Sequence, residues 1–172
     1  MKKLFLAIFF FTQIATISAQ PFVGISGTIG APTGRIGIPG AVSIYHTIGV
    51  SFYAGYRINP SLQLGAAFDR LWAPAYFKTF NGINEFSVFS KYYPTQKLAL
   101  SPYLGLWAGY ASIKYNDKSF FITPTLGFES GGKDGGLAFD LNLGYKLYKD
   151  LYFAELQNLS MFYLKMGVKY KF

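Results

Sequence analysis

The sequence predicts an all-β fold, an eight-stranded, antiparallel, up-and-down transmembrane β-barrel. Its clearest sign is the C-terminal segment 159–172, in which an apolar face ending at Phe172 alternates with a polar face that carries Lys165, Lys169 and Lys171. Alternation with a period of two is typical of a strand that has lipid on one side and a polar lumen on the other. After residue 19 no apolar run is long enough to span a bilayer as a helix, so membrane insertion would have to use strands.

The positions of the glycines are a second sign. Eight strand glycines share the parity of the polar residues: Gly49, Gly55, Gly65, Gly105, Gly109, Gly127, Gly144 and Gly167. A barrel of about eight strands has an interior that barely holds its side chains, so small inward residues relieve crowding. A soluble, lipocalin-like barrel would place its apolar residues inside instead.

The N-terminus predicts export from the cytoplasm. Lys2 and Lys3 precede an apolar run over residues 4–11, and small residues at 17–19 offer a cleavage site before Gln20. Thr12 and Gln13 interrupt the run too early for a membrane anchor. We therefore expect residues 1–19 to be a cleaved signal peptide and residues 20–172 to form one barrel domain.

Eight segments between this signal and the C-terminus read as strands. They are residues 22–30, 47–57, 62–69, 84–93, 102–111, 120–129, 137–147 and 159–172. Segment 84–93 alternates least cleanly because Phe89 falls on the polar side. Residues 59–61 and the glycine-rich residues 131–136 predict turns. Pro124 predicts a bulge or local distortion, because proline has no donor for the strand ladder.

Composition and charge narrow the functional classes. Aromatic residues make up 20% of the chain, and cysteine is absent, so it has no disulfides and no lipoprotein attachment site. The basic residues are scattered among alternating strands, and with the export signal this argues against nucleic acid as a partner. No low-complexity tract or domain linker is present.

Parity places ten charged residues inside the predicted barrel. They are Arg57, Asp69, Glu85, Lys91, Glu129, Asp140, Lys146, Lys165, Lys169 and Lys171. Buried charges persist only when they are paired, so we expect a network across the lumen. Such a narrow, filled barrel would conduct little, which leaves a channel as the third functional hypothesis.

Three segments carry a resemblance to a known family. YRINPSLQLG, KLALSPYLGLWAGY and the terminal LKMGVKYKF resemble the small outer-membrane β-barrel proteins of the OmpA/OmpX-like, porin-family type. The resemblance implies a Gram-negative outer membrane, with outer-membrane lipid around the barrel. It also implies that Val168, Tyr170 and Phe172 form the signal that the barrel assembly machinery recognises.

An even number of strands places both termini on one side of the membrane, which in this family is the periplasmic side. The turns at 58–61, 94–101 and 131–136 would then be periplasmic, and the connections 31–46, 70–83, 112–119 and 148–158 extracellular. Connection 70–83 contains Trp72, Tyr76, Phe77 and Phe80. These aromatics fit an interfacial girdle best, and the alternative is a patch for an extracellular ligand.

His46 is the one candidate for catalysis, because it is the only histidine. Outer-membrane lipid A acyltransferases and deacylases resemble this barrel size and use a histidine with a serine and a carboxylate. Ser43, Ser51, Asp69 and Glu129 could supply the partners, but no family motif surrounds them. One histidine without cysteine provides no metal cluster, and no phosphate-binding loop or other cofactor site is expected.

The sequence thus favours a non-enzymatic outer-membrane barrel with a structural or surface-interaction role through its external loops. A lipid A-modifying enzyme that uses His46 is the alternative.

Overall fold

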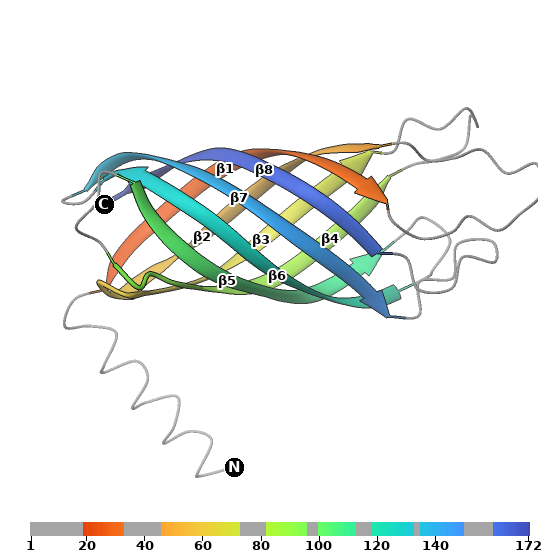
Figure 1. The fold of residues 1–172 in the computed structure, drawn as a ribbon, viewed down its shortest axis with the longest axis horizontal. Helices are drawn as coiled ribbons and strands as arrows, with labels where there is room; N and C mark the ends of the chain where they lie inside the picture. The colour runs from red at the N-terminus through yellow and green to blue at the C-terminus, as the bar shows by residue number, and fades with distance from the viewer. Residues whose placement is uncertain are drawn as a thin grey trace, which may run out of the picture.

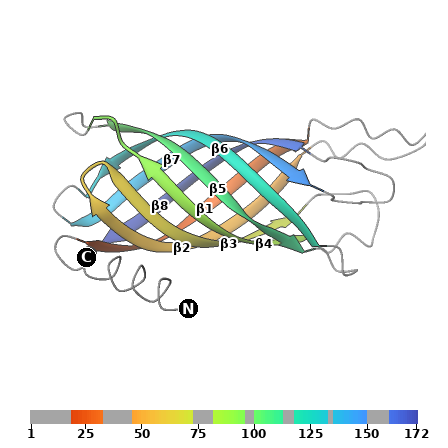
Figure 2. The same cartoon turned by 90° about the horizontal axis from the view of Figure 1, so that it is seen from below.

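The computed structural model describes residues 19–32, 46–72, 82–95, 100–112, 118–132, 135–149 and 160–172. They form a closed barrel of eight antiparallel strands, each paired with its neighbours in sequence, with the first strand paired to the last (Figures 1 and 2). The strands are β1 (Gln20–Pro32), β2 (Thr47–Asn59), β3 (Leu62–Trp72), β4 (Ile83–Tyr92), β5 (Leu100–Ser112), β6 (Lys118–Gly131), β7 (Gly136–Lys149) and β8 (Ser160–Lys171). The predicted fold class is confirmed. None of the described residues forms a helix that is long and apolar enough to cross a membrane.

The strands are strongly staggered around the barrel. A path along paired residues leaves β1 at Gln20, passes through Arg57, Lys91 and Tyr163, and returns to β1 at Gly30, ten residues further along the chain. A stagger of this kind requires strands that tilt against the barrel axis, as Figure 1 shows. Side chains from strands far apart in sequence therefore meet in the lumen.

The two faces of the sheet differ as the alternation predicts. Large apolar side chains point outward and are exposed, among them Phe86 and Val88 at 65% and Leu126 at 61%. Most polar and charged side chains of the strands point inward and are buried. The apolar surface of this barrel is therefore on its outside, opposite to a soluble barrel.

The strands extend beyond the predicted segments at several ends. Arg70 and Trp72, expected in a connection, belong to β3, because the alternation continues and Arg70 pairs with Asn84 on β4. Phe89 points inward, as its position on the polar side predicts.

The bulge or local distortion expected at Pro124 takes the form of a local gap in the ladder and not of a bulge. The ladder between β6 and β7 keeps one register on both sides of Pro124 and lacks pairs only at Thr123 and Pro124. The missing proline donor is thus absorbed as a gap in the ladder. The tight turn after β2 is confirmed, because the Ser61 backbone N–H donates to the Asn59 Oδ1 at 2.8 Å.

Strand β1 begins and strand β8 ends at the same end of the barrel, which we call the terminus end (Figure 1). The opposite end, where β1 ends and β2 begins, is called the loop end. The predicted signal peptide, residues 1–19, lies outside the described residues except for Ala19.

Candidate functional site

The lumen contains every acidic side chain that the structure describes, and each contacts a lysine. Asp69 of β3 accepts from the Lys165 Nζ of β8 at 2.6 Å. The other pairs are Lys91–Asp140 and Lys146–Glu85, both between β4 and β7, and Lys169 and Lys171 of β8 with Glu129 of β6. These pairs join strands that are not neighbours, so the charges meet across the lumen.

Tyrosine hydroxyls supply further donors to the same carboxylates. Tyr103 donates to Asp140 at 2.5 Å, Tyr93 donates to Glu129 at 2.5 Å, and Tyr148 donates to Glu85. Burial of an ion pair is favourable only when its remaining hydrogen-bonding capacity is also satisfied. The tyrosines therefore help the carboxylates to remain inside the barrel.

Aromatic rings complete the surroundings of four lysines. The Lys91 Nζ lies 4.5 Å from the Tyr103 ring centroid, and the Lys165 Nζ lies 4.6 Å from the Trp107 ring centroid. Lys146 lies over Phe121 and Lys169 over Phe22, each at 4.8 Å. A cation over a ring face is attracted by the ring quadrupole, which offsets part of its desolvation.

Arg57 is the one residue of the predicted ten that makes no ion pair among the described residues. Its Nη2 donates to the backbone carbonyl of Pro60 at 2.9 Å, and its guanidinium lies 5.7 Å from the ring centroid of Tyr93. It is half-buried close to the terminus end. The other nine are joined in the contacts above.

Apolar side chains also occupy the lumen, and of these the sequence analysis named only Phe89 on the polar face. A cluster at the loop end consists of Leu71, Ile83, Ala111, Phe121, Tyr148, Met161 and Tyr163, and a second cluster of Phe22, Tyr53, Ala67, Phe89 and Trp107. The signal for the first was present, because continued alternation in β3 and β4 turns Leu71 and Ile83 inward. The filled lumen thus combines ion pairs with aromatic and aliphatic packing.

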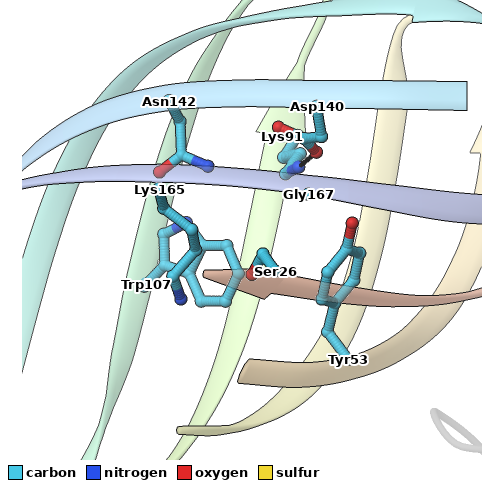
Figure 3. Close-up of a pocket in the computed structure, with 8 residues that line it drawn as sticks. All are labelled: Ser26, Tyr53, Lys91, Trp107, Asp140, Asn142, Lys165 and Gly167. Carbon is cyan, nitrogen blue, oxygen red and sulfur yellow. Dashed lines mark hydrogen bonds and ion pairs between the residues drawn. The ribbon is translucent and has the colours of Figure 1, made fainter. Parts of the chain in front are cut away.

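A small cavity lies in the lumen between the Lys91–Asp140 pair and Lys165 (Figure 3). It leaves about 10 Å³ for the centre of a water molecule, which is room for about one water. Three buried polar atoms on its wall have no hydrogen-bond partner in the protein: Ser26 Oγ, Trp107 Nε1 and Asn142 Oδ1. The cavity is too small for a substrate or a conducting path.

The structure does not assemble a catalytic site around His46 from the residues it describes. His46 is exposed just before β2 at the loop end. Ser51 and Asp69 lie inside the barrel, where Lys165 donates to both, and Glu129 contacts lysines near the terminus end. Ser43 lies outside the described residues. No group of three possible metal ligands occurs in the described part of the chain.

Of the four loop aromatics, the structure describes Trp72 alone. Its side chain is 41% exposed at the end of β3, and the Arg70 guanidinium lies 6.0 Å from its ring centroid. Tyr76, Phe77 and Phe80 lie outside the described residues. Whether they form a girdle or a ligand patch stays a prediction.

The predicted assembly-signal residues lie on and just after β8. Val168 and Tyr170 point outward, and the Phe172 backbone N–H donates to the Pro21 carbonyl of β1 at 3.0 Å. The Phe172 ring is 64% exposed and lies 5.1 Å from the Tyr170 ring, centroid to centroid. Recognition of this end by an assembly machinery also stays a prediction.

Solved structures share this architecture along most of the chain. Neisserial surface protein A (NspA) matches with a TM-score of 0.66 at 18% identity, over 90% of this chain and 99% of its own. The fold is that of a small outer-membrane barrel. OprG of Pseudomonas aeruginosa matches at 13% identity with a TM-score of 0.52, over 89% of this chain and 96% of its own. Ail, the attachment invasion locus protein of Yersinia pestis, matches at 12% identity with a TM-score of 0.52, over 91% and 100%.

The likeness of this barrel to those structures extends to architecture alone. No protein-family model and no curated protein matches the sequence. A de novo designed transmembrane β-barrel also matches, with a TM-score of 0.51 at 16% identity. Because a designed protein shares the fold, function has to be argued from this chain's own residues.

Proposed function

We propose that this chain is an integral outer-membrane barrel with a closed lumen, non-enzymatic, that supports its loop-end connections for a structural or surface-interaction role. The observation that carries this proposal is the filled lumen described above. The ion pairs, the loop-end apolar cluster and the aromatic cluster occupy the interior of the barrel.

The outer surface supports membrane integration. Exposed aliphatic and aromatic side chains cover all eight strands, and exposed tyrosines lie toward the terminus end at Tyr56, Tyr92 and Tyr170. In water such a continuous apolar surface would drive aggregation. In a bilayer the same side chains contact lipid tails, which are as apolar as they are. The tyrosines fit the interfacial level, where one end of the ring is apolar and the other is wet.

A closed lumen argues against the channel hypothesis. A barrel of eight strands has an interior just wide enough for side chains, and open channels belong to barrels with about sixteen strands. Movement of an ion through the lumen would require buried pairs to separate, and a charge left unpaired in a buried site costs several kcal/mol. The fold therefore serves as a rigid support.

A surface-interaction role is consistent with what one neighbour of the same size does. Ail is called an attachment invasion locus protein and has been crystallised with the heparin analogue sucrose octasulfate. By analogy, the loop end of this chain is the expected place for a ligand contact, with Trp72 at its edge.

The closed lumen is tested by conductance. Protein refolded into planar lipid bilayers should give no steady channel current, while its heat-modifiable mobility on gels shows that it has folded. The channel current of the wild type is compared with that of a variant with Lys91→Ala and Asp140→Ala. This variant lacks one ion pair, and so both of its charges, next to the existing cavity. Steady current from the wild-type barrel would contradict the closed lumen.

The enzyme alternative is tested through His46, and the interaction role through residues 73–81. Replacement of 73–81 by a short glycine-containing turn should leave the barrel folded, because loop length has little effect on stability, and should abolish adhesion of cells to matrix.

His46→Ala should leave adhesion and the lipid A profile unchanged. An altered lipid A mass spectrum that depends on His46 would support the enzyme instead.

A further inference from the structure

Three buried polar groups line the small cavity in the lumen and have no hydrogen-bond partner in the protein. They are the Ser26 hydroxyl of β1, the Trp107 indole N–H of β5 and the Asn142 Oδ1 of β7. The three residues are 5%, 4% and 3% exposed, so bulk water does not reach these groups. In folded proteins nearly all buried polar groups have a partner, which is either protein or ordered water. The three groups therefore indicate a ligand inside the cavity.

The space for this ligand lies where the lumen wall has no side chain. Gly167 of β8 lies in register between Ser26 of β1 and Asp140 of β7. A Cβ atom at Gly167 would lie 2.5 Å from the Ser26 Cβ atom, so a larger residue would have to displace β1. Ser26, Trp107 and Asn142 can thus face one space from different sides, as Figure 3 shows.

The ligand must be small, and it must both donate and accept hydrogen bonds. The cavity has room for about one water molecule. The Trp107 Nε1 can only donate, the Asn142 Oδ1 can only accept, and the Ser26 hydroxyl can do either. A water molecule satisfies all three groups at once, and about three hydrogen bonds are usual for a buried water.

A monatomic ion fits the same cavity less well. An anion could accept from Trp107, but it would leave the Asn142 Oδ1 without a donor, and the Asp140 carboxylate on the wall would repel it. A cation would face the Trp107 N–H and the ammonium groups of Lys91 and Lys165, which also line the cavity. Both lysines already have a carboxylate partner, so no charge on the wall requires an ion to balance it.

We propose that the cavity binds one ordered water molecule, which accepts a hydrogen bond from the Trp107 Nε1, donates one to the Asn142 Oδ1 and shares a third with the Ser26 hydroxyl. These residues lie on β1, β5 and β7, and no two of these strands pair with each other. The water therefore joins three separate strands across the lumen, next to the buried ion pairs. The inference goes beyond the proposed function and requires only the filled lumen described above.

Proton NMR tests the water through the Trp107 indole. Trp72→Phe leaves Trp107 as the only tryptophan of the sequence, and Trp72 is not on the cavity wall. In this barrel, refolded in nanodiscs of deuterated lipid, the Trp107 Nε1 proton should show a nuclear Overhauser peak at the water frequency. The peak should have the sign of a slowly tumbling pair, because a water held in a closed lumen turns with the barrel.

Two further changes identify the source of this peak. Asn142→Leu replaces the acceptor by methyl groups that fill the cavity, and it keeps the exchangeable protons of Ser26, Lys91 and Lys165. We expect the peak to be lost in this variant, and an undiminished peak would overturn the proposal. Ser87→Ala is the matched control, because it removes an unpartnered buried hydroxyl that is not on the cavity wall. The peak should remain in Ser87→Ala.

A crystal structure of the wild-type barrel decides the question even if Asn142→Leu does not fold. Density for one water should lie about 3 Å from both the Trp107 Nε1 and the Asn142 Oδ1. A cavity without density would overturn the proposal, and so would an anomalous peak in the cavity of crystals soaked in bromide, which would show an anion. Steady channel current from the wild type would instead contradict the closed lumen of the proposed function.

Discussion

At the scale of single residues, the lumen is fitted around glycine and aromatic pairs. In four register pairs a glycine on one strand lies opposite an inward aromatic residue on the next: Gly24 and Tyr53, Gly65 and Phe89, Gly127 and Tyr103, and Gly144 and Tyr163. A Cβ atom at Gly127 would lie 2.3 Å from the Tyr103 ring, and one at Gly144 would lie 2.6 Å from the Tyr163 ring. The absent side chain is what allows each ring to lie flat against the wall.

Replacement of such a glycine should therefore be costly. We expect Gly127→Ala to destabilise the barrel by about 1–3 kcal/mol, because the added methyl group must displace a buried ring. Gly27→Ala is the matched control, since Gly27 points outward and a Cβ there meets nothing within 4 Å; its effect should stay within about 0.5 kcal/mol. Urea titration of the barrels in lipid vesicles measures both, and equal effects would contradict the packing described here.

The buried ion pairs allow a second prediction at this scale. Asp140→Asn leaves Lys91 buried without a counter-charge and should cost about 3–5 kcal/mol. The double change Lys91→Met with Asp140→Leu removes both charges and should cost less than the single change, because no unpaired charge remains. The same titration reads both, and a double variant less stable than the single variant would show that the pair itself stabilises the fold.

At the scale of the strand, the alternation of apolar and polar residues is the basis of nearly every structural prediction made from the sequence. It was sufficient for eight strands, for the inward glycines and for the charged residues that face the lumen. It could not predict which charges pair, because partners such as Lys165 and Asp69 lie 96 residues apart and meet only when the stagger of the closed barrel is known. It also missed the loop-end apolar cluster, because a polar lumen was expected along the whole strand.

Depth within the membrane gives a strand-scale prediction. Leu141 lies near the middle of β7 and Leu137 near its terminus end, and both point outward. Leu141→Arg should cost about 2–4 kcal/mol, and Leu137→Arg about 0–1 kcal/mol, because the cost of a charge falls toward the interface. Equal costs in denaturant titrations would place the apolar belt at a different level of the barrel.

At the scale of the whole molecule, β1 begins and β8 ends at one end of the barrel, and the outward charge of the described residues lies at the other. The absence of cysteine in the sequence makes this arrangement accessible to labelling, because any introduced thiol is unique. The position of the strand ends and the position of the outward charge together predict how the barrel is oriented in the membrane.

We expect His46→Cys to react with a membrane-impermeant maleimide on intact cells, because His46 is exposed at the loop end. Ser61→Cys, in the turn at the terminus end, should react only after the outer membrane is opened. The reverse pattern would show that the barrel is inserted with its termini outward.

Strand β8 supplies Lys165, Lys169 and Lys171 to the acids of β3 and β6. These contacts therefore cannot form until the last strand has docked, and they report on how it has docked. A slip of one residue exchanges the two faces and is rejected by hydrophobicity, but a slip of two residues preserves both faces. The positions of the lysines, together with the pairing of Gly144 with Tyr163, distinguish the correct docking from the second error.

The positions of the lysines on β8 thus favour the native register of β8 when the barrel closes. In a variant with Asp69→Asn and Glu129→Gln, closure should become less selective. Ile29→Cys should then form disulfides with Leu164→Cys, its partner in the native register, and also with Met166→Cys, its partner after a slip of two residues. With the acids in place only the Leu164 pair should form, so that electrostatics in the interior would decide the alignment of the seam that lipid alone leaves ambiguous.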